Sequence, residues 1–212
     1  CNRNFVNDCY NNRPIESNPE NKSLQKCICE NLVGEPFFFD SSDSGYFDSQ
    51  VYICNTKANE LLVCCRGTES TSDVISDLKA WKNNLYDIYY HNNFTSYRKT
   101  LGMPCIHSGF NDQYNTIKFI IYHKVYEYLL TEPERPTVIF TGHSLGGALA
   151  TIAAACMAVQ FSNRKNLDIQ CYTFGSPRVG NKAFVKIFDK FVGRSERIVN
   201  ELDPVPMIPR IT

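Results

Sequence analysis

One serine, set between an apolar run and a run of small residues, constrains the fold of this chain more than any other feature. Residues 142–146 read Gly-His-Ser-Leu-Gly and fit the G-x-S-x-G pattern. A β-rich run, 137–141, precedes the pattern, and a helix-forming run, 148–159, follows it. This context predicts a nucleophile elbow, a strained strand-to-helix turn that presents a hydroxyl at the edge of a sheet. The bare pattern also occurs in loops by chance, and the flanking runs argue against that alternative.

Ser144 and Leu145 are therefore the first candidate site residues. The backbone N–H of Leu145 would point at the same spot as the Ser144 hydroxyl and supply half of an oxyanion hole. Gly142 and Gly146 suit the flanks of the turn, where a crowded backbone leaves no room for a Cβ. A serine hydroxyl also needs a base that takes its proton and a third group that orients the base.

Strand-like runs alternate with helical periodicity along most of the chain. Apolar residues recur every three or four positions over 110–130, which is typical of an amphipathic helix. Further helices are predicted over 145–161 and 181–191, and strands over 51–54, 61–65, 85–90, 138–141, 169–174 and 196–199. The alternation predicts an α/β fold of three layers, in which helices cover both faces of a mostly parallel central sheet.

We expect one folded domain and an arm. The length of 212 residues suits a single α/β domain, assigned to residues 50–212. Residues 1–49 are expected to form an irregular arm with a short helix over 24–32. The 22 Lys and Arg residues balance the 22 Asp and Glu residues, so no charge excess favours nucleic acid as a partner. The apolar run 145–159 is too short to span a bilayer and suits a buried helix.

Eight of the ten cysteines divide into two groups by their surroundings. Four fall inside predicted strands or helices, where Cys behaves as a small buried apolar residue: Cys64, Cys65, Cys156 and Cys171. Four lie in the polar N-terminal arm and are better suited to disulfides: Cys1, Cys9, Cys27 and Cys29. The sequence has no C-x-x-C pair and no nearby His cluster, so we expect no zinc site.

Asp203 is the candidate for the orienting acid. It follows the predicted strand 196–199, whose carboxyl end should meet the sheet edge where the elbow opens. Pro204 and Pro206 would stiffen this loop and fix the carboxylate. An Asp-Pro turn with no catalytic task explains the same residues equally well.

The junction after the predicted strand 61–65 offers the second oxyanion donor. Gly67 permits close approach of the backbone to a substrate, and Thr68 can donate through its N–H or its hydroxyl. A plain turn is the alternative. The next segment, 70–85, has an apolar helical stripe and is either a movable lid or a packed surface helix. The lid residues singled out are Ser70, Asp73, Val74 and Asp77.

Taken together, these segments resemble a known family, the fungal-type class 3 lipases, which are α/β-hydrolases acting on acylglycerols and related esters. The matching segments are 66–68, 106–110, 141–148, 174–181 and 197–206, in family order. The resemblance implies that Ser144 is the nucleophile, Asp203 the triad acid, and Thr68 and Leu145 the oxyanion hole. It also implies a lid over 70–79, with Val74 where the family often carries a large aromatic residue.

The same resemblance implies a lipid or small-ester substrate, transient contact with a membrane or lipid interface, and no cofactor. It favours a secreted or membrane-associated protein. The cysteines placed in core strands fit a reducing interior equally well, so the compartment stays open.

The triad base has no candidate downstream of Asp203. All four histidines precede Ser144: His91, His107, His123 and His143. We therefore expect a chain that is incomplete at its C-terminus, with the base in the full-length form. Alone, it should keep only the roughly 10³–10⁴-fold acceleration that binding and the oxyanion hole supply. The alternatives are a catalytically dead lipase-like binding protein, or His107 as a surrogate base.

Overall fold

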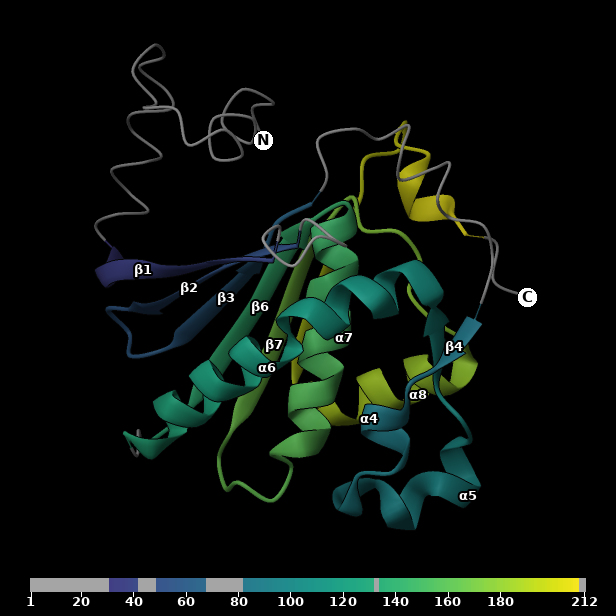
Figure 1. Cartoon of the computed structure of the whole chain (residues 1–212), viewed down its shortest axis with the longest axis horizontal. Helices are drawn as coiled ribbons and strands as arrows, with labels where there is room; N and C mark the ends of the chain where they lie inside the picture. Colours follow the sequence, from purple (N-terminus) through teal and green to yellow (C-terminus); the bar gives the residue numbers. More distant parts are fainter. Residues whose placement is uncertain (1–30, 42–48, 68–81, 132–133, 210–212) are drawn as a thin grey trace.

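The computed structural model describes residues 31–41, 49–67, 82–131 and 134–209. They form a six-stranded sheet in the order β1-β2-β3-β6-β7-β8 and a separate two-stranded sheet, β4-β5 (Figure 1). The six strands are β1 (Leu32–Asp40), β2 (Gln50–Thr56), β3 (Leu61–Cys65), β6 (Thr137–His143), β7 (Asp168–Phe174) and β8 (Arg194–Ile198). The smaller sheet pairs β4 (Lys82–Asn84) with β5 (Cys105–His107).

The strand directions confirm the predicted α/β class and its mostly parallel sheet. Strands β3, β6, β7 and β8 run parallel to one another, and β1 and β2 add an antiparallel edge. The predicted long helices are confirmed as α6 (Ser108–Leu130), α7 (Leu145–Gln160) and α8 (Lys182–Phe191). Shorter elements are α4 (Tyr86–Tyr89), α5 (Arg98–Leu101) and the 3₁₀ turns η2 (Asn92–Tyr97) and η3 (Val205–Met207).

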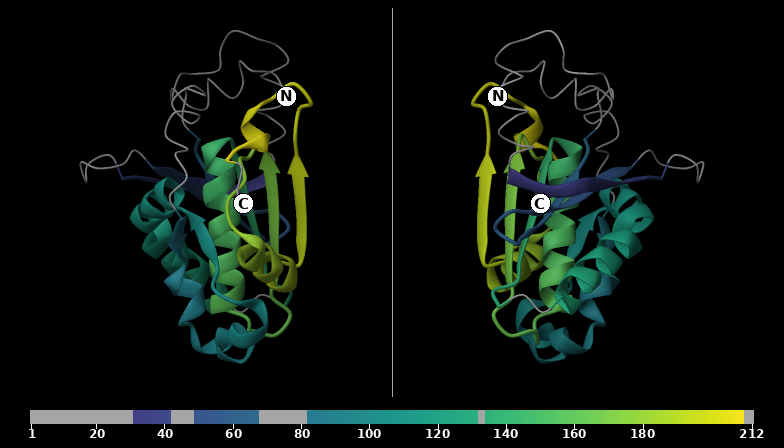
Figure 2. Two further views of the ribbon diagram at one scale, coloured as in Figure 1. Left: turned by 90° about the vertical axis from the view of Figure 1, so that its right-hand side faces the viewer. Right: turned by 90° about the vertical axis from the view of Figure 1, so that its left-hand side faces the viewer.

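Helices α6, α7 and α8 lie on the same face of the sheet (Figure 2). From β3 to β8 each crossover moves to the next strand in the same direction. Right-handed crossovers that all move one way must place their helices on one side. The second helical layer that the sequence predicted has no counterpart among the described residues.

Helix α7 is the centre of the core because its side chains are small. Between Leu145 and Val159 every residue except Thr151 is buried. The Ala and Gly residues bring the helix axis close to β6 and β7, so the backbone after Ser144 packs directly against these two strands. The apolar run 145–159 is thus a buried helix, as predicted. No helix in the described ranges is long and apolar enough to cross a membrane.

Two local predictions were wrong. The run 85–90, predicted as a strand, contains helix α4, because the residues it buries are Leu85 and Ile88, which are three positions apart. Strand β1 lies within the segment expected to be irregular. Gly34 and Pro36 interrupt its pattern, and the pairing with β2 shifts register between Val33 and Phe37. The domain division at residue 50 stays a prediction.

The described cysteines behave mostly as apolar residues. Cys65, Cys156 and Cys171 are buried, Cys64 is half-buried, and none of the six described cysteines forms a disulfide. Burial raises the pKa of the Cys156 and Cys171 thiols to about 12, so both stay protonated. The proposed bridge formers Cys1, Cys9, Cys27 and Cys29 lie outside the described residues. No cluster of three or more metal-ligating side chains occurs in the described ranges.

Tyr128 supports a testable prediction about the fold. Its hydroxyl donates to the Asn59 carbonyl at 2.7 Å and accepts from the Thr137 N–H at 3.1 Å, joining α6, the β2–β3 turn and β6. Replacing Tyr128 with Phe leaves both backbone groups without this partner and should lower the free energy of unfolding by about 1–3 kcal/mol.

Chemical denaturation followed by circular dichroism measures this change. The control is Tyr126→Phe, on the exposed side of the same helix, where the hydroxyl has no hydrogen bond within the described ranges. Equal stability of the two variants would contradict the prediction.

Candidate active site

Ser144 occupies a strained turn between β6 and α7. Its φ of 53° and ψ of −124° are rare for a residue with a side chain, and its N–H donates to the Phe174 carbonyl at 2.9 Å. The residue is 3% exposed, and its Oγ has no hydrogen-bond partner in the part of the chain that the structure describes. A buried hydroxyl without a partner is costly unless something else uses it.

The elbow packs directly against the end of β3. A Cβ on Gly146 would collide with the Cys65 carbonyl oxygen and lie 2.7 Å from the Arg66 carbonyl carbon and 2.8 Å from the Gly67 nitrogen. Only glycine permits this approach of two backbones. The contact brings the turn of Ser144 beside the junction after β3, as the sequence predicted.

The oxyanion candidates are described only in part. Leu145 is buried and begins α7, where the first N–H groups have no acceptor within the helix. Thr68 lies outside the described residues, one position beyond Gly67. The proposed lid residues Ser70, Asp73, Val74 and Asp77 also lie outside the described residues.

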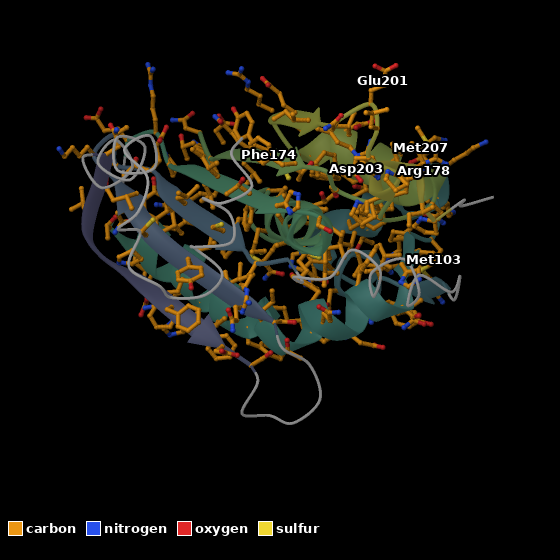
Figure 3. All side chains as sticks on the ribbon, turned by 90° about the horizontal axis from the view of Figure 1, so that it is seen from above. Met103, Phe174, Arg178, Glu201, Asp203 and Met207 are labelled. Atoms are coloured by element: carbon orange, nitrogen blue, oxygen red, sulfur yellow. The ribbon has the colours of Figure 1, made fainter. Side chains whose placement is uncertain are left out.

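Asp203 lies at the same edge of the sheet, in the loop after β8. Its Oδ2 lies beside Gly175, where an added Cβ would be 2.9 Å away, whereas Glu201 of the same loop points outward (Figure 3). Its Oδ1 accepts the Val205 N–H at 3.0 Å, the bond of an Asx turn. The turn that sequence reasoning offered as an alternative is therefore present, and it holds the carboxylate in a fixed orientation.

His143 lies near Asp203, a proximity that sequence reasoning missed. A Cβ built on Gly175, whose φ is +56°, would lie 2.9 Å from Asp203 Oδ2 and 3.4 Å from His143 Nε2. Desolvation of the imidazole lowers the pKa of His143, and the negative charge of Asp203 partly opposes this. The register that pairs His143 with Phe174 sets this geometry, because it places Gly175 beside the elbow.

The other histidines have structural surroundings. His107 is buried, with its ring centroid 4.8 Å from that of Phe110. His123 is exposed, and its Nδ1 lies 3.3 Å from Glu127 Oε1. His91 caps η2 by accepting the Asn93 N–H.

Comparison with known proteins places the chain in a family. The family described as Lipase (class 3) matches residues 62–212. The chain belongs to the class 3 lipase family. This assignment confirms the resemblance seen in the motifs.

Individual class 3 lipase relatives agree. The chain is 34% identical over 122 residues to secreted mono- and diacylglycerol lipase 1 of Fusarium solani, covering 56% of this chain and 35% of the relative. It is 28% identical over 185 residues to a lipase of Rhizopus niveus, covering 86% and 44%. The chain thus spans less than half the length of these two relatives.

The solved structures confirm the α/β-hydrolase-like fold of this class 3 lipase chain. The crystal structure of lipase from Rhizopus microsporus var. chinensis superposes with a TM-score of 0.68 at 27% identity. The match covers 97% of this chain and 64% of that one.

The contact between the elbow and β3 yields a prediction. Replacing Gly146 with Ala forces the Cβ into the backbone of β3, and overpacking of this kind costs about 1–3 kcal/mol in stability. Thermal unfolding measures the loss. The control is Gly109→Ala in α6, where the new Cβ would lie 3.4 Å from its nearest neighbour, His107 Nδ1. This substitution should leave the stability unchanged or raise it by up to about 1 kcal/mol. A Gly146→Ala protein as stable as the control would disprove the proposed close packing.

Proposed function

We propose that the protein is a carboxylic ester hydrolase acting on acylglycerols or related lipid esters, with Ser144 as its nucleophile. One observation carries the proposal. Ser144 lies on a strained turn, and its buried hydroxyl has no hydrogen-bond partner among the described residues. The turn packs against the end of β3, and the Asp203 loop lies at the same edge of the sheet. Strain and an unused buried hydroxyl lower stability, so their presence favours a catalytic role.

In the proposed reaction Ser144 Oγ attacks the acyl carbonyl while a base removes its proton. The negative charge on the carbonyl oxygen is received by the N–H of Leu145 and by Thr68. Collapse of this intermediate expels the alcohol, which takes up the proton, and leaves the acyl group on Ser144. Water then releases the fatty acid by the reverse sequence of proton transfers.

Asp203 would orient the histidine base of this triad. The hydroxyl of Ser144 has no hydrogen-bond partner in the described ranges, so it is not bonded to any of the four histidines, all of which are described. We therefore assign Asp203 the orienting role and assign the base to none of them. The lid over 70–79 and contact with a lipid surface remain part of the proposal, and the secreted Fusarium relative supports secretion.

A fluorophosphonate probe tests the nucleophile. We expect slow but stoichiometric labelling, with the adduct located on Ser144 by peptide mass spectrometry, because the oxyanion hole alone leaves roughly 10³–10⁴-fold acceleration. Ser144→Ala should abolish labelling, and Ser162→Ala, an exposed serine in the turn after α7, should not change it. Absence of labelling in the unmodified chain would favour the alternative, a lipase-like binding protein without catalysis.

Added imidazole tests the role of Asp203. If Asp203 orients the base, imidazole should accelerate p-nitrophenyl ester hydrolysis by the unmodified chain, and Asp203→Asn should reduce that acceleration about tenfold or more. The control is Glu201→Gln, an exposed carboxylate of the same loop that points away from the site. The rate of ester hydrolysis by the Ser144→Ala protein with imidazole is the background to be subtracted. Equal acceleration in the Asp203→Asn and Glu201→Gln proteins would rule out the orienting role.

A further inference from the structure

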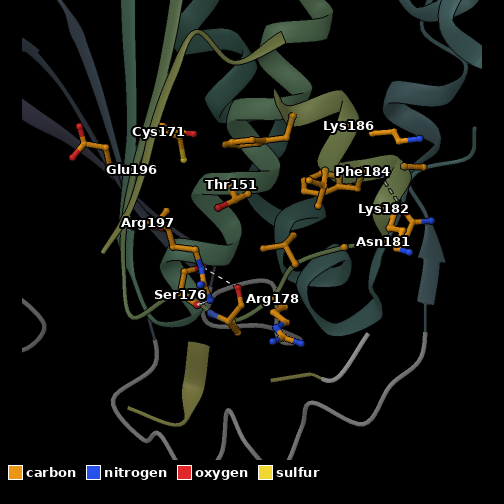
Figure 4. A pocket seen from close by; sticks show the side chains of 18 residues that line it. Thr151, Cys171, Ser176, Arg178, Asn181, Lys182, Phe184, Lys186, Glu196 and Arg197 are labelled. Carbon is orange, nitrogen blue, oxygen red and sulfur yellow. Dashed lines mark hydrogen bonds between the residues drawn. The ribbon is translucent and has the colours of Figure 1, made fainter. Parts of the chain in front are cut away.

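Arg197 links two loops that are also joined by a backbone hydrogen bond, from the Arg178 N–H to the Ile208 carbonyl at 2.8 Å. It lies in β8 opposite Thr173 of β7, and its Nη2 donates to the Ser176 carbonyl at 2.7 Å and to the Pro206 carbonyl at 2.8 Å. Figure 4 shows the guanidinium reaching toward Ser176, while Arg178 points away from it. One carbonyl belongs to the loop after β7 and the other to η3, so a single guanidinium bridges both loops to the edge strand.

Partial burial disfavours the charged form of Arg197, and its two hydrogen bonds to carbonyl groups offset this cost. Desolvation, and then the positive charge of Arg178, lower the pKa of Arg197. Within the described ranges no carboxylate forms an ion pair with Arg197. Ser176 and Pro206 are buried, and their carbonyl groups require donors. Charge-assisted bonds to two buried carbonyls are stronger than neutral ones, which explains why the guanidinium stays there.

The two bridged loops hold opposite halves of the proposed site. Ser176 packs under the elbow helix, since a Cβ on Gly147 would lie 2.8 Å from Ser176 Cβ. Pro206 lies in η3, which begins at Val205, and the Val205 N–H holds the Asp203 carboxylate. A continuous set of contacts therefore runs from the base of the elbow through Arg197 to the carboxylate.

We propose that Arg197 is a positioning residue that fixes the Asp203 carboxylate relative to the Ser144 elbow. The proposal rests on the proposed function only in giving Asp203 a catalytic role; the positional link can be tested without catalysis. Arg197 does not contact Asp203 directly. It would act through its hydrogen bonds to the backbone carbonyl groups of Ser176 and Pro206.

The experiment compares four variants of the whole chain by NMR: Arg197→Met, Arg197→Lys, Arg194→Met and Asp203→Asn. Arg194 is a matched control, because it lies in the same strand but pairs with the exposed Glu196 at 2.8 Å. The first measurement is hydrogen exchange of the Val205 amide, which reports the bond to Asp203. The second is the pKa of the His143 imidazole, which the negative charge of Asp203 raises, so that movement of the carboxylate away from the ring lowers it.

We expect Arg197→Met to speed exchange of the Val205 amide about tenfold or more and to lower the pKa of His143 toward the value in Asp203→Asn. Arg194→Met should change neither quantity. Arg197→Lys keeps the positive charge, so a partial effect in this variant shows that the fork geometry matters. It also serves as the test protein if Arg197→Met fails to fold.

Unchanged Val205 exchange and an unchanged pKa of His143 in both Arg197 variants would overturn the proposal. Both readouts are independent of ester hydrolysis. Absence of fluorophosphonate labelling in the unmodified chain would therefore refute the nucleophile and leave the positional link standing. An unaltered loop in the Arg197 variants would refute the link and leave the nucleophile standing.

Discussion

The backbone contact between Gly146 and the end of β3 is the constraint on which the rest of the site depends. Because no side chain separates the two segments, the first turn of α7 lies directly against Arg66 and Gly67. This contact fixes the turn of Ser144 relative to the residue that precedes Thr68. The parallel register of β6, β7 and β8 then brings the Asp203 loop to the same edge. The arrangement follows from glycine positions and strand order more than from side-chain contacts.

The parts of the fold that were predicted correctly are those in which local preference and burial agree. The run 137–161 combines β-branched residues, a glycine-flanked turn and a helix of small residues, and all three signals identify the same structure. The run 85–90 carries conflicting signals, since its Ile and Tyr residues have strand propensity while Leu85 and Ile88 are buried at helical spacing. Strand β1 escaped prediction because it is stabilised by pairing with β2, a partner outside its own sequence.

The same distinction applies to the site. The position of Ser144 and Asp203 at one edge of the sheet could be predicted from the sequence, because each follows a parallel strand whose carboxyl end reaches that edge. The proximity of His143 and Asp203 could not be predicted, since it depends on the register between β6 and β7 and on the positive φ of Gly175. The bridge made by Arg197 depends on two loops that are far apart in the sequence. A sequence motif identifies recurring residues, but it does not show that the Arg197 guanidinium donates to the Ser176 and Pro206 carbonyl groups.

The small side chains of α7 have a consequence for the proposed reaction. A helix packed this closely against β6 and β7 holds the turn of Ser144 in one position. Under the proposed function, the geometry of attack would therefore be set by the core of the domain, and preference for one ester over another would arise in residues outside α7.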